Sequence, residues 1–170
     1  LGGIRFHYNA MDFDIWCLSD TWAFRENIIP LEDAHNLFKT TLMTWDAVLY
    51  DVYARKVISP ENYLEDLLDK RLELVLSQTP NEPGSLVKIL RTIYTKPVDS
   101  LGPRLCEFLR QTLNQYNPQT LLHYEFTHYR THSFNTIQIA NLSEKLRDFE
   151  EGRDLPVSHN LSSQQLPLHF

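Results

Sequence analysis

The stretch LEDAHNLFKTTLMTWDAVLYDVYARK, residues 31–56, decides the fold that the sequence predicts. Its apolar side chains recur every three or four residues, which is the spacing of one side of an α-helix. This stripe consists of Leu31, Ala34, Phe38, Leu42, Trp45, Leu49 and Val52. Pro30 and the Glu32-Asp33 pair fit a helix start, because carboxylates there meet the positive end of the helix dipole. We therefore expect residues 31–56 to form the central core helix.

Further helices are predicted on both sides of this segment. Residues 11–27 carry apolar residues at helical spacing, and residues 59–78 start with Ser59-Pro60 and present a leucine-rich face. Later helices are expected from Ser85, over 101–116, over 118–132 and over 135–151, the last ending at Gly152. The loop 79–84 contains two prolines and a glycine, so it separates two helical halves.

The two ends of the chain do not follow the helical pattern. Residues 1–10 start loosely and then alternate Ile4, Phe6 and Tyr8, so we expect a short extended arm that packs alone or pairs with another chain. Residues 153–170 have the composition of an irregular C-terminal tail. Because the 170 residues include only five glycines, we predict an all-α single domain, a bundle of about six helices over residues 11–152.

Charge and hydropathy restrict the classes of partner. The formal net charge is −6, which disfavours nucleic acid. Binding to nucleic acid would require the cations to cluster, namely Arg91, Lys96, Arg104 and Arg110. No apolar run approaches the roughly 20 residues that span a bilayer, and no signal peptide is recognisable, so we expect an intracellular chain, cytoplasmic or nuclear, without a membrane partner.

One segment concentrates the side chains that bind metals. In HYEFTHYRTH, residues 123–132, Glu125, His128 and His132 stand at i, i+3 and i+7, so on a helix they would share one stripe. Two imidazoles and a carboxylate could hold one divalent transition metal such as zinc and leave a fourth position open. The favoured alternative is that the histidines lie on a solvated or partner-facing side of the helix, without any cofactor.

Aromatic residues and arginine are the side chains that dominate protein interfaces. Trp22 with Arg25, and Tyr124 with Tyr129 and Arg130, are therefore candidates for partner binding. Trp22 could equally close the first helix onto the central one. The tail adds Leu166, Leu168 and Phe170, which could occupy a groove of their own domain or of a neighbouring copy.

No complete catalytic motif accompanies these residues: a nucleophile elbow and a glycine-rich phosphate loop are both missing from the sequence. We therefore expect a non-enzymatic helical domain for protein–protein interaction or oligomerisation, of an adaptor or regulatory kind. Its partner would be another protein or a second copy in a homodimer. The alternative is a metal-binding helical enzyme or sensor that uses the stripe of Glu125, His128 and His132.

Overall fold

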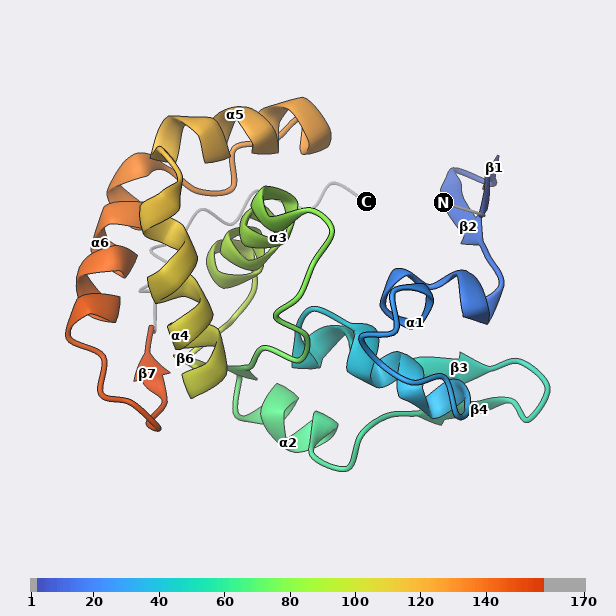
Figure 1. Ribbon diagram of the computed structural model, residues 1–170. Coiled ribbons are helices and arrows are strands. Elements are labelled where there is room, and N and C mark those ends of the chain that lie inside the picture. Colours follow the sequence, from blue (N-terminus) through green and yellow to red (C-terminus); the bar gives the residue numbers. More distant parts are fainter. Residues whose placement is uncertain (1–2, 158–170) are drawn as a thin grey trace, which may run out of the picture.

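The computed structural model describes residues 3–157, in which helices are combined with three small sheets (Figure 1). The predicted all-α bundle is therefore wrong, and the fold is mixed α/β. The strands are β1 Ile4–Tyr8, β2 Met11–Ile15, β3 Leu49–Asp51, β4 Lys56–Ile58, β5 Arg71–Leu72, β6 Ser100–Leu101 and β7 Leu155–Pro156. The α-helices are α1 Trp22–Arg25, α2 Tyr63–Leu68, α3 Glu82–Thr95, α4 Pro103–Thr112, α5 Pro118–Tyr129 and α6 Thr136–Arg147. Short 3-10 helices are η1 Leu18–Asp20, η2 Ala34–Thr40, η3 Thr44–Asp46 and η4 Leu113–Gln115.

The helices α3 to α6 form the body of the molecule and share one hydrophobic core. α3 is the central helix of this body, with α5 packed against it, and α6 packs on α4 (Figure 1). The inner face of α3 consists of Leu86, Val87, Ile89, Leu90 and Ile93, each with 0% of its surface exposed. The core helix of the fold is therefore α3 and not the stretch 31–56.

Asparagine caps begin three of these helices. The side chain of Asn81 accepts a hydrogen bond from the Gly84 amide at the start of α3, and Asn117 accepts one from the Gln119 amide at the start of α5. Each satisfies an amide that has no partner within the helix. Asn135 and Gln138 exchange hydrogen bonds in a capping box at the start of α6. The predicted starts of the last two helices are confirmed, whereas α3 begins before Ser85 because Asn81 already caps it.

The predicted helix over residues 31–56 is wrong. The chain there forms η2 and η3, then β3 and a turn into β4. Met43 is extended and almost fully buried, and the residues beside it exchange backbone hydrogen bonds with Glu73 and Val75. Asp51 accepts hydrogen bonds from the Tyr53 and Ala54 amides, which closes the turn after β3. Backbone pairing with Glu73 and Val75 and the polar turn at Asp51 thus outweigh the helical spacing of the apolar residues.

Two other helix predictions are largely wrong, and two fail at their ends, one of them because α5 stops at Tyr129 and not at His132. Of residues 11–27, only α1 is α-helical, because Met11–Ile15 pairs as β2 with β1. Of residues 59–78, only α2 is helical, and its Leu64, Leu67 and Leu68 are exposed instead of facing a core. The last helix ends at Arg147, and Gly152 lies in a later turn with a φ of +81°.

A three-stranded sheet joins distant parts of the chain. β5 pairs in parallel with β6, which pairs antiparallel with β7. Immediately after β5, the buried Glu73 places Oε1 within 2.7 Å of the Leu74 amide and 2.8 Å of the Leu105 amide. This carboxylate therefore caps the first turn of α4. Its close approach requires Gly102, where any Cβ would collide with the Glu73 carboxylate.

Arg71 holds the segments around this sheet together. Its guanidinium donates to Asp66 of α2 at 3.1 Å, to Glu73 at 3.3 Å and to Asp154, just before β7, at 2.8 Å. These three carboxylates raise the pKa of the guanidinium above its ordinary value, with Asp154 contributing most. The backbone carbonyl of Arg71 also accepts a hydrogen bond from the Trp45 indole at 2.8 Å. One residue thus connects α2, η3, β5 and the segment before β7.

We predict that Glu73→Ala lowers the free energy of unfolding by about 3 kcal/mol, because two buried amides lose their acceptor and Arg71 loses a partner. Urea denaturation followed by circular dichroism measures this change. The matched control is Glu144→Ala on the exposed side of α6, which should change stability by less than about 0.5 kcal/mol. Equal effects of the two substitutions would contradict the capping role of Glu73.

Candidate functional site

The β1–β2 hairpin separates apolar and polar side chains onto opposite faces. Opposed residues of an antiparallel pair point to the same side, and successive residues alternate sides. The register therefore places three apolar pairs on one face: Ile4 with Ile15, Phe6 with Phe13, and Tyr8 with Met11. The two phenylalanine rings stack with centroids 5.1 Å apart. We call these six side chains the apolar face of the hairpin.

The opposite face carries charged pairs. Arg5 donates to Asp14 through Nε at 2.6 Å and through Nη2 at 2.9 Å, and His7 lies 2.8 Å from Asp12. The bidentate hydrogen bonds from Arg5 lower the pKa of Asp14 below its ordinary value. Asn9 and Ala10 both have positive φ, as the two-residue hairpin turn of type I′ requires.

Part of the polar face borders a hollow between the hairpin and the η1–α1 segment. Arg5, Asp14 and Trp16 line a hollow of about 550 Å³ together with Asp20 and Trp22 of the η1–α1 segment. The apolar face lies on the other side of the hairpin, and it is not covered: Ile4 is 71% exposed and Tyr8 63% exposed. Both faces of the hairpin are therefore exposed to solvent, the apolar one as well as the charged one.

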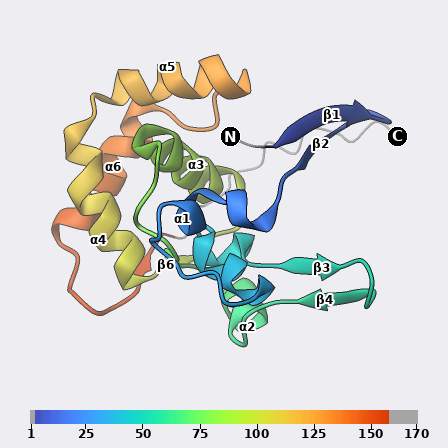
Figure 2. The same cartoon turned by 45° about the vertical axis from the view of Figure 1, so that its right-hand side comes forward.

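A second hairpin, formed by β3 and β4, projects from the same side of the molecule (Figures 1 and 2). Tyr50 and Val57 are opposed in its ladder and are 58% and 62% exposed, and Val52 and Tyr53 in its turn are 73% and 101% exposed. Both hairpins lie on the side away from α6 (Figure 2).

Exposed apolar side chains are concentrated in the first part of the chain. Of the eighteen large apolar residues that are exposed within residues 3–157, fifteen precede residue 69, and the others are Phe126, Tyr129 and Ile137. Contiguous apolar surface beyond a few hundred Å² is unusual on a monomer and marks interaction sites. The two hairpins are therefore the strongest candidate for a functional surface.

Glu125, the predicted carboxylate ligand, is a buried structural residue. It has 0% exposure, accepts from Arg91 at 2.7 Å, and accepts from the Ser133 amide at 2.9 and 3.1 Å. Arg91 also donates to the hydroxyls of Thr131 and Ser133 and lies over the Tyr129 ring. This ion pair fixes the loop between α5 and α6 against α3.

The two predicted histidine ligands lie apart from this pair. α5 ends at Tyr129, and Arg130 takes a left-handed conformation, so His132 lies beyond the helix and the three residues do not form a helical stripe. His128 hydrogen-bonds the Tyr124 carbonyl and stacks on its ring, and His132 stacks on Phe126. Within residues 3–157, no three His, Cys, Asp or Glu side chains are placed to hold a metal ion together.

The predicted partner-binding residues are divided between two regions. Trp22 is half-buried at the base of the β1–β2 hairpin, and Arg25 is exposed beside it. Tyr124 and Tyr129 lie on α5, and Arg130 follows it directly. Tyr124 accepts a hydrogen bond from Asn81, and Arg130 lies over the Phe126 ring. The remaining predicted residues, Leu166, Leu168 and Phe170, lie outside the described residues.

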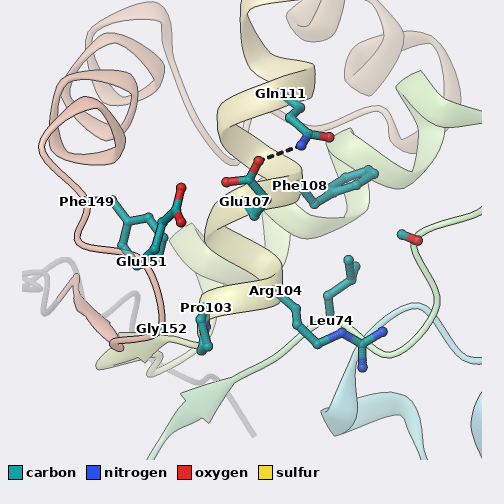
Figure 3. A pocket seen from close by; sticks show the side chains of 10 residues that line it. Leu74, Pro103, Arg104, Glu107, Phe108, Gln111, Phe149, Glu151 and Gly152 are labelled. Carbon is teal, nitrogen blue, oxygen red and sulfur yellow. Dashed lines mark hydrogen bonds between the residues drawn. The ribbon is translucent and has the colours of Figure 1, made fainter.

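A hollow of about 560 Å³ lies between α4 and the segment after α6 (Figure 3). Figure 3 shows Glu107 and Glu151 on the side of Phe149, and Arg104 on the side of Leu74. Arg110 pairs with both carboxylates, at 2.6 and 3.2 Å, and Arg104 donates to the Val75 carbonyl. The charged groups of this hollow are therefore engaged in holding α4 to its neighbours.

The buried cysteine of α4 is also structural. Cys106 has 0% exposure, and burial, with a smaller contribution from Glu73, raises the pKa of its thiol to about 12. A thiol with this pKa stays protonated at neutral pH and is a poor nucleophile. Cys106 packs in the core together with Leu105 and Leu109 of α4.

The extended character of Ile4, Phe6 and Tyr8 was predicted, but the second strand of the hairpin was missed although its signal is present in the sequence. The segment MDFDI, residues 11–15, alternates apolar and acidic residues as strictly as β1 does, with two turn residues between the two runs.

Within residues 3–157, the longest α-helix, α3, has 14 residues, and no helix is both long and apolar enough to cross a bilayer.

We predict that the hairpin loosens in acid. Because Arg5 lowers the pKa of Asp14 in the folded state, the contribution of this pair is complete above about pH 3.9, the ordinary aspartate value, and is lost as the pH falls through the lowered pKa. Amide chemical shifts of residues 4–15, followed from pH 6 to pH 2, measure the change. Asp14→Asn should remove this transition; an identical profile in both proteins would contradict the prediction.

We also predict that Glu125→Gln lowers the free energy of unfolding by about 2 to 4 kcal/mol in metal-free protein, because Arg91 is left without a charged partner. His128→Gln on the exposed side of α5 is the control and should cost less than about 0.5 kcal/mol. Urea denaturation with a chelator and with added zinc measures both variants. Stabilisation by zinc that disappears in both variants would favour a metal site instead.

Comparison of the chain with family models, with curated proteins and with solved structures found no match.

Proposed function

We propose that this chain is a non-enzymatic protein-interaction domain whose contact surface is the apolar face of the β1–β2 hairpin. The observation that carries the proposal is the exposure of this apolar face. Five of its six apolar side chains are exposed to solvent, with Phe13 partly buried, and Arg5 and Asp14 of the opposite face line the hollow toward η1 and α1. Removing such an apolar face from water lowers the free energy, and in this proposal a partner protein covers it.

The size and shape of the hairpin support this proposal. An isolated two-stranded hairpin is at best marginally stable in water, and packing of one face against another surface provides what it lacks. The exposed side chains include Phe6, Tyr8 and Met11, which belong to the residue types enriched at interfaces. Trp22, a predicted partner-binding residue, lies at the base of this hairpin and lines its hollow.

The remaining features of the domain are consistent with a scaffold. Two buried carboxylates pair with arginines and with backbone amides, and these contacts hold helices and strands in place. The two pairs are Glu125 with Arg91 and Glu73 with Arg71. The role of the α3–α6 body, in this proposal, is to present the hairpin from a rigid base.

Site-specific photo-cross-linking tests the proposal. A benzophenone amino acid is introduced at Tyr8 on the apolar face or at His7 on the polar face, and the two variants are irradiated in the cells that naturally contain the chain. The two sites are adjacent in sequence and differ only in the face they occupy. We expect one discrete adduct from position 8 and none from position 7.

The adduct from position 8 should also disappear when Ile4→Asp is added, because a charge then lies within the apolar face. Adducts that form equally from both positions would indicate nonspecific contact. That result, or the absence of any adduct from position 8, would overturn the proposal that this face binds a protein.

A further inference from the structure

We propose that the hollow beside the β1–β2 hairpin binds a quaternary ammonium group, such as the trimethylammonium of choline or of a trimethylated lysine. In this proposal the indoles of Trp16 and Trp22 contact the methyl groups, and the Asp20 carboxylate balances the positive charge. The inference goes beyond the proposed function, because the hollow borders the polar face of the hairpin and not its apolar face.

The hollow has the size of a small-molecule site and aromatic walls. Its volume of about 550 Å³ lies within the roughly 300 to 1,000 Å³ of ligand pockets. Two of the three tryptophans of the chain line it, Trp16 just after β2 and Trp22 at the start of α1. In the part of the chain that the structure describes, neither indole stacks on another ring and no cationic side chain lies over either one. Tryptophan is the best aromatic partner of a cation, so both indoles are suited to receive one from a ligand.

The charges that line the hollow leave one carboxylate without a partner. Arg5 donates to both oxygens of Asp14, at 2.6 and 2.9 Å, so these two charges neutralise each other. Asp20 is half-buried in the wall of the same hollow, and no donor among residues 3–157 reaches its carboxylate. The formal charge of the hollow is therefore −1, which favours a cationic ligand.

Hydrogen bonds within a short segment hold the aromatic and acidic groups in place. The Trp16 indole donates to the Thr21 hydroxyl at 3.1 Å. The Asp20 amide donates to the Cys17 carbonyl at 2.9 Å, and the Thr21 amide donates to the Leu18 carbonyl at 3.1 Å, which closes the turn of η1. The site is thus formed before any ligand arrives, and a preformed site loses less conformational entropy on binding.

The small number of free hydrogen-bond acceptors favours a methylated cation. A primary ammonium carries three N–H donors and a guanidinium five, and each needs an acceptor when it leaves water. The Asp14 carboxylate and the Thr21 hydroxyl already accept hydrogen bonds within the fold, which leaves mainly the Asp20 carboxylate. A quaternary ammonium has no N–H donor to satisfy, and its methyl groups pack directly on indole rings.

Isothermal titration calorimetry of the full chain with choline tests the inference. The control ligand is 3,3-dimethyl-1-butanol, a neutral molecule of the same shape in which carbon replaces the ammonium nitrogen. We expect choline to bind at least about tenfold more tightly, because the indoles and the carboxylate attract its charge. Ethanolamine, which has the charge without the methyl groups, should also bind at least about tenfold more weakly than choline.

Two substitutions connect binding to the hollow. Asp20→Asn removes the charge and Trp16→Leu removes an aromatic face, so each should weaken choline binding at least about fivefold. The control for the first is Asp12→Asn, on the polar face but outside the hollow. The control for the second is Phe126→Leu on α5, because Phe126 is 44% exposed and Trp16 is 50% exposed. Both controls should leave choline binding unchanged, and circular dichroism verifies that each variant is folded.

A second ligand, acetylated trimethyl-lysine amide, distinguishes the sources of the group. Tighter binding than choline assigns the site to a modified protein, and weaker binding assigns it to a small molecule; both results support the quaternary ammonium. Failure of both ligands to bind at about 10 mM, or equal binding of choline and its neutral analogue, would overturn the inference. Choline binding that persists unchanged in Asp20→Asn and Trp16→Leu would place the site elsewhere and overturn it as well.

Discussion

The buried carboxylate of Glu73 is the constraint on which the rest of the structure depends. A charge this far from water needs several partners, and Glu73 finds them in two backbone amides and in Arg71. Those partners belong to the start of α4 and to the strand β5, so satisfying one carboxylate fixes the helical body against the small sheet. Arg71 then extends the connection to Asp66 and Asp154. The first third of the chain is attached to the body through the buried Met43, the backbone hydrogen bonds of its neighbours with Glu73 and Val75, and the Trp45 indole.

The sequence predicted the second half of the fold well, because its signals there are local. Asn117-Pro118 and Asn135 with Gln138 specify helix starts through contacts within four residues, which any surrounding structure preserves. Residues 31–56 fail for the opposite reason. The spacing of their apolar residues fits a helix, but Met43 pairs with Leu74 in an isolated antiparallel β-bridge. No local sequence pattern encodes a contact between residues so far apart in the chain. The strand Met11–Ile15 was missed because its aspartates were not read as one face of an alternation.

The candidate site was less predictable than the fold. Alternation identifies the apolar face of β1, but whether that face is covered depends on how the whole domain packs. Glu125 shows the same limit for the predicted metal site. Its spacing to His128 fits a ligand pair on one helix, but its buried carboxylate accepts a hydrogen bond from Arg91. The left-handed Arg130 also ends the helix before His132. The residue types of the sequence thus predicted exposed apolar side chains in general, whereas the place where they gather required the tertiary structure.

The turn that closes the first hairpin has a consequence for affinity. Asn9 accepts a left-handed backbone readily, but Ala10 does so at a cost of about 1 to 2 kcal/mol, which glycine would avoid. This cost lowers the stability of the closed hairpin, the conformer that carries the apolar face. Any partner selects the closed fraction, and its apparent dissociation constant rises in inverse proportion to that fraction. A residue at the tip of a turn can thus tune recognition without touching the partner, through the conformational entropy that is lost when the two strands order.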